Sequence, residues 1–135
     1  MMIYPICQSF VKEADLCGIK SGRELDKFER CGFETYQREG DPELPVYADA
    51  PLVLTVHVEQ SLDLDSHELF ICRIDDVLLH EELIDKNGKV HLEKAGLVAY
   101  AHGEYYGLGP ELGFFGYSAA SPKVLRRRMP KTRKF

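Results

Sequence analysis

Apolar and polar residues alternate most regularly in the middle of the chain. In residues 52–60, LVLTVHVEQ, apolar side chains at every second position predict a β-strand with one buried face. Residues 68–79, ELFICRIDDVLL, predict a second strand, because the segment is long and rich in β-branched side chains. Its length and composition favour a central position in a sheet.

Turn signals extend this β-rich region toward the C-terminus. Asn87-Gly88, within IDKNGKVHL, is the dipeptide most typical of a tight β-hairpin turn. Farther on, LVAY (97–100) and EYYGL (104–108) flank AHG, which predicts two more strands with a tight connection. By contrast, residues 40–51 contain three prolines and little periodicity, so we expect a loop there.

A short helix is expected before the strands. Ser9 is a candidate N-cap for a helix that ends at Cys17, just before Gly18. Helical spacing would place Phe10, Ala14 and Cys17 on one face of it.

A second helix is expected after Ser21. Ser21 and Glu24 match the S-x-x-E capping box, in which each residue satisfies a free backbone donor of the other. Leu25 and Phe28, three residues apart, would share the buried face, and Gly32 would end the helix.

Two short helices followed by consecutive strands predict a mainly β fold, either a small barrel or a sheet with short helices attached. A small antiparallel sheet has to hide its edges, and it does so by closing or by dimerising. No repeat or linker divides residues 1–122, which are predicted to form one domain.

Residues 123–135, KVLRRRMPKTRKF, hold seven of the 17 basic residues and no acidic one, whereas the rest of the chain has ten basic and 22 acidic residues. We expect a solvated, disordered tail. The alternative is contact with nucleic acid or with an acidic partner surface. Because no nucleic-acid-binding motif accompanies these cations, nucleic acid is not an expected partner.

The remaining chemistry is sparse. The four cysteines are scattered without a C-x-x-C pair, and His80-Glu-Glu-Leu is not H-E-x-x-H, so we expect buried free thiols and no metal site. No apolar run approaches the roughly 20 residues that cross a bilayer, and the N-terminus does not resemble a signal peptide. We therefore expect no membrane partner and a cytoplasmic location.

Three segments carry a family resemblance: VKEADLCGIKSGRELDKFERCGF (11–33), DSHELFICRIDDV (65–77) and GEYYGLGPELG (103–113). Together and in this order they resemble the flavin reductase-like family, from about residue 10 to residue 113. The resemblance implies an FMN-binding split β-barrel that acts as a homodimer. It also implies an oxidoreductase that passes electrons from NAD(P)H through FMN to an acceptor, either a protein or a small molecule. Family members have further strands before this point, so the domain looks N-terminally truncated.

The resemblance and the local chemistry suggest several site residues. A phosphate is bound by backbone donors, a hydroxyl and a cation, which Ser21, Gly22, Lys27 and the nearby Arg23 would supply. The alternative is that Ser21 only caps, Gly22 only permits a turn and Lys27 is a surface charge. The family match makes Ser21, Gly22 and Lys27 positions at the flavin site.

Three more positions follow from the family match. His67 matches a histidine on the nicotinamide side of the flavin, where it would act in catalysis, and a polar turn residue is the alternative. Tyr105 and Tyr106 match a segment close to the flavin or the dimer partner, and strand alternation predicts one ring inward and one outward.

A different class of function stays open: a non-catalytic dimerising or binding remnant of a flavin reductase domain.

Overall fold

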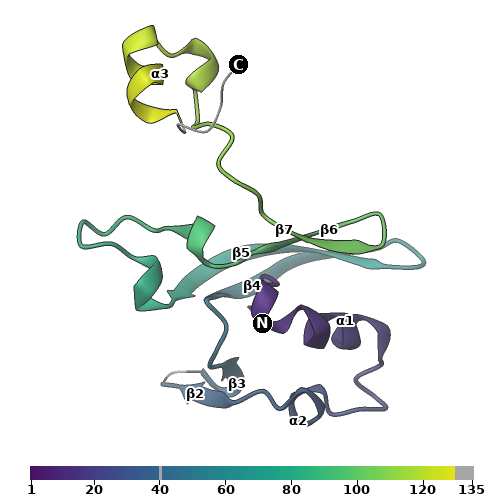
Figure 1. The fold of residues 1–135 in the computed structure, drawn as a ribbon. Coiled ribbons are helices and arrows are strands. Elements are labelled where there is room, and N and C mark those ends of the chain that lie inside the picture. Colours follow the sequence, from purple (N-terminus) through teal and green to yellow (C-terminus); the bar gives the residue numbers. More distant parts are fainter. Residues whose placement is uncertain (40, 130–135) are drawn as a thin grey trace.

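The structure is a computed structural model, and it describes residues 1–39 and 41–129. Its centre is an antiparallel hairpin of two long strands, β4 (Leu52–Asp63) and β5 (Glu68–Leu79) (Figure 1). Their register runs from the Leu52–Leu79 pair to the Asp63–Glu68 pair at the tip. The short strand β1 (Met2–Ile3) pairs with the other edge of β4 and completes a three-stranded sheet. Both predicted central strands are confirmed.

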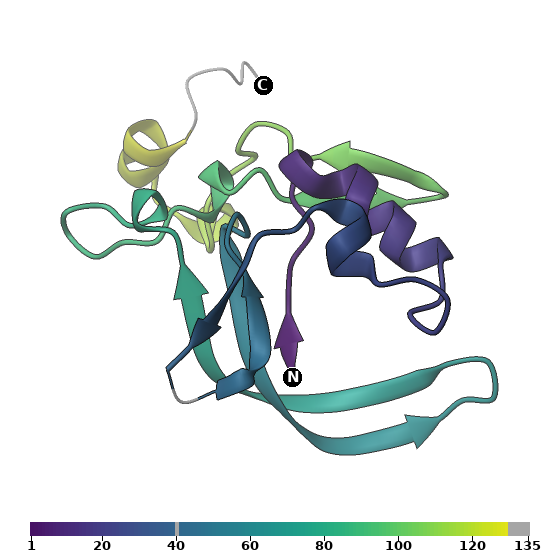
Figure 2. The ribbon, with the colours of Figure 1, turned by 90° about the horizontal axis from the view of Figure 1, so that it is seen from below.

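The central hairpin bends part-way along its length, as Figure 2 shows. The register shifts between Thr55 and Val56 and again between Val58 and Gln60, and such bulges bend and twist a strand pair. Before the bend, β4 is largely buried, whereas residues 57–63 are all exposed. We call residues 57–74, the projecting part, the hairpin arm.

Two smaller sheets lie beside the central one. β2 (Thr35–Arg38) pairs with β3 (Asp41–Tyr47), and β6 (Val98–Ala101) pairs with β7 (Glu104–Gly107), both antiparallel. Within the described residues, neither pair joins the central sheet through a strand ladder. The mainly β prediction is confirmed, and the sheets stay open rather than closing into a complete barrel.

The loop prediction for residues 40–51 is wrong, because β3 occupies Asp41–Tyr47. Its Pro45 lies opposite Gln37 of β2. Among the described strands β3 pairs with β2 alone, so a residue without an N–H group is tolerated on its other edge. The prolines therefore mark an edge strand here.

The first helix differs from its prediction at both ends. A 3₁₀ turn, η1 (Gln8–Phe10), leads into α1 (Val11–Ile19), and Phe10 rather than Ser9 is the N-cap residue. The Ser9 hydroxyl lies 3.0 Å from the Cys7 thiol instead of capping the helix. Gly18 lies inside the last turn, where it tolerates helical backbone angles.

The second helix, α2 (Lys27–Cys31), starts later than predicted. Its N-cap is Asp26, whose Oδ1 accepts the backbone N–H of Glu29 at 3.1 Å. Ser21 starts a separate turn, so the predicted Ser21–Glu24 capping box is wrong. Gly32 ends the helix as predicted, with a φ of 67° that favours glycine.

The core is small and lies where β3 crosses the base of the central hairpin. Val46, Ala50 and Val53 are buried there, and partly buried side chains of Met2, Tyr4, Tyr47 and Leu78 pack against them. An ion pair between Arg38 of β2 and Asp76 of β5 joins the same two sheets at the surface. The hydrogen bond from Arg38 lowers the pKa of Asp76.

Both predicted tight turns are present. His102 and Gly103 connect β6 to β7 with positive φ angles of 52° and 86°. At Asn87-Gly88, the Asp85 N–H donates to the Lys89 carbonyl at 2.9 Å, but this turn joins only the isolated bridge between Ile84 and Val90. The single-turn helices η2 (Glu81–Leu83) and η3 (Leu92–Lys94) flank it. The turn is confirmed as a turn, without a strand pair beside it.

The C-terminal segment leaves the body of the molecule. An extended connection leads from β7 to η4 (Tyr117–Ala119) and α3 (Pro122–Arg128), which stand apart in Figure 1. The disordered-tail prediction for residues 123–135 is wrong for residues 123–128, which form a helix, and residues 130–135 lie outside the described residues. None of the helices in the described ranges has the length and hydropathy to cross a membrane.

Deleting residues 123–135 should leave the melting temperature nearly unchanged. α3 buries no residue, and its contact with the preceding segment is the Arg128 guanidinium 4.1 Å from the centre of the Phe114 ring. Helix formation without burial contributes little to stability. Differential scanning calorimetry of the full and shortened chains is the measurement. A drop of several degrees would mean that the tail packs on the acidic body.

Candidate functional site

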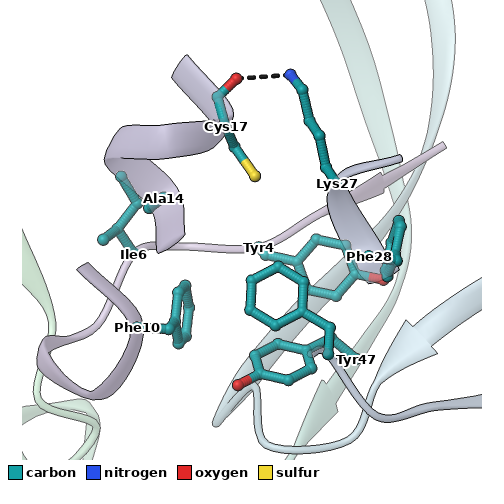
Figure 3. A pocket seen from close by; sticks show the side chains of 9 residues that line it. Tyr4, Ile6, Phe10, Ala14, Cys17, Lys27, Phe28 and Tyr47 are labelled. Carbon is teal, nitrogen blue, oxygen red and sulfur yellow. Dashed lines mark hydrogen bonds between the residues drawn. The ribbon is translucent and has the colours of Figure 1, made fainter. Parts of the chain in front are cut away.

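A pocket of about 390 Å³ lies between the two helices, the N-terminal segment and β3 (Figure 3). Most of its lining is aromatic or aliphatic. The lining residues are Tyr4, Ile6, Phe10, Ala14, Cys17, Lys27, Phe28, Phe33 and Tyr47. We call this cavity the aromatic pocket.

Five aromatic residues reach the pocket from separate parts of the chain. Tyr47 at the end of β3 is central, because its ring lies 5.5 Å from that of Phe10 and 4.3 Å from that of Phe33. Phe33 in turn lies 6.0 Å from Phe28 of α2, nearly edge-on. Gly32 makes this last contact possible, because its left-handed backbone turns Phe33 back toward the helix. The rings of Phe10, Tyr47, Phe33 and Phe28 thus form a continuous series of edge-on and tilted contacts along the pocket.

Lys27 is the single charged side chain among the described residues that line this pocket. Its Nζ donates a 2.6 Å hydrogen bond to the Cys17 carbonyl in the last turn of α1, drawn in Figure 3. Last-turn carbonyls have no partner within a helix, and cations stabilise that end. The lysine thus bridges the end of α1 and the start of α2 at the pocket wall.

The pocket tyrosines are neutral groups. Burial raises the pKa of both Tyr4 and Tyr47, and Asp49 adds to the effect at Tyr47. The Tyr4 hydroxyl donates to the Pro45 carbonyl at 2.7 Å, which fixes its ring against β3. The positive charge of Lys27 is therefore uncompensated by any ionised pocket side chain.

Ser21, Gly22 and Arg23 form an exposed turn between the two helices, outside the pocket. The Ser21 hydroxyl accepts the backbone N–H of Arg23 at 3.2 Å. Lys27 is the first residue of α2, so it does not lie inside a helix that starts after Ser21, as the sequence predicted. The four predicted phosphate contacts thus lie on one segment, with only Lys27 at the cavity.

Tyr105 lines a second cavity of about 340 Å³ on the other side of the N-terminal segment, together with Tyr4, Ile6 and Tyr100. Its hydroxyl donates to Asp15 of α1 at 3.1 Å. Burial, then this hydrogen bond, raises its pKa. Tyr105 is therefore the inward ring of the predicted pair. Tyr106 is exposed and bonds to Glu104 of the same strand.

His67 lies at the tip of the hairpin arm. It is exposed, and its Nδ1 is 2.8 Å from the Ser66 hydroxyl. Asp65 beside it has a positive φ of 62°, which marks the tight turn between β4 and β5. Neither His67 nor Tyr106 lines the aromatic pocket or the second cavity.

Sequence reasoning missed most of the aromatic pocket. Phe10 and Phe28 were assigned to buried helix faces, whereas Tyr4, Phe33 and Tyr47 belong to segments without periodicity. The available signal is the concentration of aromatic residues between positions 4 and 47, without any motif that joins them. Only the fold brings these rings together.

Comparison with solved structures places the fold. Flavoredoxin of Desulfovibrio vulgaris (Miyazaki F) is 26% identical, with a TM-score of 0.75 over 88% of this chain and 64% of its own. A split barrel domain protein from Shewanella frigidimarina is 21% identical, with a TM-score of 0.70 over 86% and 59%. An FMN-binding protein from Thermus thermophilus is 19% identical, with a TM-score of 0.58 over 78% and 56%.

The chain thus spans less than two thirds of the length of these solved structures. No curated protein sequence matches it significantly. The sequence model of one family, described as the flavin reductase like domain, matches residues 3–109. This range includes the aromatic pocket, the hairpin arm and the β6–β7 pair, and the fold is the one its split-barrel neighbours share. The chain therefore belongs to the flavin reductase like domain family.

Proposed function

We propose that this protein is a flavin-dependent oxidoreductase that binds FMN at the aromatic pocket. The observation that carries this proposal is a set of five aromatic side chains around one lysine, in a cavity of about 390 Å³. This volume is within the range of roughly 300–1,000 Å³ of small-molecule sites, which are mostly apolar with a few polar groups. A planar flavin ring system carrying an anionic chain fits such a lining.

The chain's own residues have distinct tasks in this proposal. The aromatic rings hold the flat ring system and keep water away from it. Lys27 would neutralise negative charge, and Ser21, Gly22 and Arg23 would contact the phosphate from the adjoining turn. Bound FMN would supply the redox chemistry, taking a hydride from NAD(P)H for transfer to an acceptor. In this proposal, His67 and Tyr106 act only where a second copy brings its arm or its β7 strand to the pocket.

Reconstitution with FMN tests the proposal directly. The purified chain should quench the fluorescence of added FMN and turn yellow after removal of excess ligand. A flavin-loaded protein should also oxidise NADH or NADPH with an artificial electron acceptor. Colourless protein that fails to take up FMN at high micromolar concentration would refute the proposal.

Replacing Lys27 by Ala should weaken FMN binding by about 1–3 kcal/mol, the range for a lost charge-assisted hydrogen bond. Arg23→Ala is the competing variant, because Arg23 lies in the exposed turn beside the pocket. Lys89→Ala, in the Asn87-Gly88 turn, is the matched control and should bind like the parent. Fluorescence titration gives each dissociation constant.

Two results would change the assignment. Equal titration curves for Lys27→Ala and the parent would remove Lys27 from the site. Weakening by Arg23→Ala alone would place the phosphate at the exposed turn. Circular dichroism of each variant identifies any loss of folding.

The second candidate function is a dimerising module without catalysis, and the hairpin arm favours it. Strand alternation puts Phe70 and Ile74 on one face of the arm and Leu69 and Ile71 on the other. All four side chains are between 44% and 56% exposed. Apolar side chains on both faces are typical of a strand that is covered on both sides. We propose that a second copy covers the arm, whether or not FMN binds.

The protein should therefore sediment as a homodimer or larger assembly at micromolar concentration. The double variant Phe70→Lys/Ile71→Lys, with one charge on each face of the arm, should sediment as a monomer. Phe115→Lys is the control, because Phe115 is fully exposed on the C-terminal connection, away from the arm. A monomeric parent chain would contradict the proposal, and so would a double variant that stays dimeric.

A further inference from the structure

The ends of α1 and α2 lie against each other through two cysteines. Cys17 is in the last turn of α1, and Cys31 is the last residue of α2. The two cysteines are neighbours, because Cys17 adds to burial in raising the pKa of Cys31, and Cys31 lines a cavity together with Leu16, the residue before Cys17. The hydrogen bond from Lys27 to the Cys17 carbonyl holds the same two helices together.

This thiol pair also lies between two cavities. Cys17 lines the aromatic pocket, and Figure 3 shows its sulfur between Ala14 and the Lys27 side chain. Cys31 lines a third cavity of about 310 Å³ on the other side, with Leu16, Ile19 and Arg30. Both cysteines are half-buried rather than buried as the sequence suggested, and both are free thiols. A small reagent can therefore approach the pair from a cavity.

We propose that Cys17 and Cys31 are a reversible dithiol–disulfide pair that links α1 to α2 when oxidised by a low-molecular-weight disulfide. This proposal does not depend on FMN binding. The other two cysteines have different places in the fold: Cys7 is buried beside Ser9, and Cys72 lies in the hairpin arm.

The exchange proceeds in two steps. One protein thiolate attacks a sulfur of the small disulfide, breaks its S–S bond and releases one small thiolate, which leaves a mixed disulfide on the protein. The second protein thiolate then attacks the protein sulfur of that mixed disulfide and releases the second small thiolate. Two protein thiols thus lose two electrons and two protons, and the small disulfide becomes two thiols.

The surroundings of Cys31 affect how readily it attacks. Burial, then the neighbouring Cys17, raises the pKa of Cys31, whereas Arg30 acts in the opposite direction. The attack by Cys31 therefore speeds up as the pH rises, because it needs the Cys31 thiolate.

Oxidation would close a loop from residue 17 to residue 31. That loop contains the exposed Ser21–Arg23 turn and Lys27, whose side chain reaches back to Cys17. A covalent link at its base restricts how far α2 can move from α1. The redox state of the pair would therefore control how far the aromatic pocket opens between α1 and α2.

The test uses the full chain and an excess of oxidised glutathione. Thiol titration should fall from four to two free thiols per chain, and digestion without reductant should yield one linked fragment containing residues 17 and 31. Dithiothreitol should restore all four. Trypsin cleaves after Lys20 and Arg23, which lie between the two cysteines. The resulting fragments should stay joined in the oxidised protein and separate after reduction.

Single cysteine variants distinguish a Cys17–Cys31 link from reactions of the other cysteines. Cys17→Ser and Cys31→Ser should each stop at a stable mixed disulfide with glutathione on the remaining cysteine. Cys72→Ser is the control and should still form the Cys17–Cys31 link. The proposal fails if residues 17 and 31 stay unlinked in the oxidised parent chain, or if Cys72 takes part in the link.

Discussion

The pairing of β4 with β5 is the constraint on which the rest of this molecule depends. The two strands hold the described chain together, since β1 pairs with β4 and the Arg38–Asp76 ion pair ties the β2–β3 sheet to β5. The small core sits at the base of this hairpin, around Val53. Beyond the two bulges the same strands continue without cover, so one hairpin serves both as scaffold and as exposed arm.

The aromatic pocket follows from this arrangement. The N-terminal segment is held by β1 on the central sheet, which fixes Tyr4 and Ile6 beside the core. The two helices then close over that segment, linked by the hydrogen bond from Lys27 to the Cys17 carbonyl. The pocket is therefore built between elements that each contribute few side chains. Small movements of α2 would therefore change the shape of the pocket more than the stability of the folded protein.

Sequence reasoning worked best where the pattern is local. Period-two alternation located β4, and length with β-branched side chains located β5. The glycine turns at Gly88 and Gly103 and the helix end at Gly32 were found because each needs a backbone that glycine favours. Sequence reasoning failed where contacts between distant segments determine the local structure. The prolines of residues 41–47 suggested a loop, although β3, an edge strand among the described residues, accepts Pro45. Ser21 matched a capping box, yet Asp26 is nearer the start of α2 and caps it.

The site was only partly predictable for the same reason. Lys27 was identified from its segment, and the structure places it at a cavity wall. Its aromatic neighbours come from five separate stretches, and nothing in the sequence states that β3 folds back against the helices. His67 lies in the turn between β4 and β5, and strand alternation points Tyr106 outward beside the inward Tyr105, so neither reaches the aromatic pocket.

The bent hairpin also implies uneven local stability along a single pair of strands. Backbone amides near Val53 and Val56 lie under the core, so their exchange with solvent deuterium requires the hairpin base to open. Amides of the arm are hydrogen-bonded in the same ladder but have no side chains of the same copy packed over them, so brief fraying from the tip exposes them in a single copy. Deuterium uptake of a single copy would thus divide β4 at its bulges, with the slow and fast halves meeting between Thr55 and Gln60.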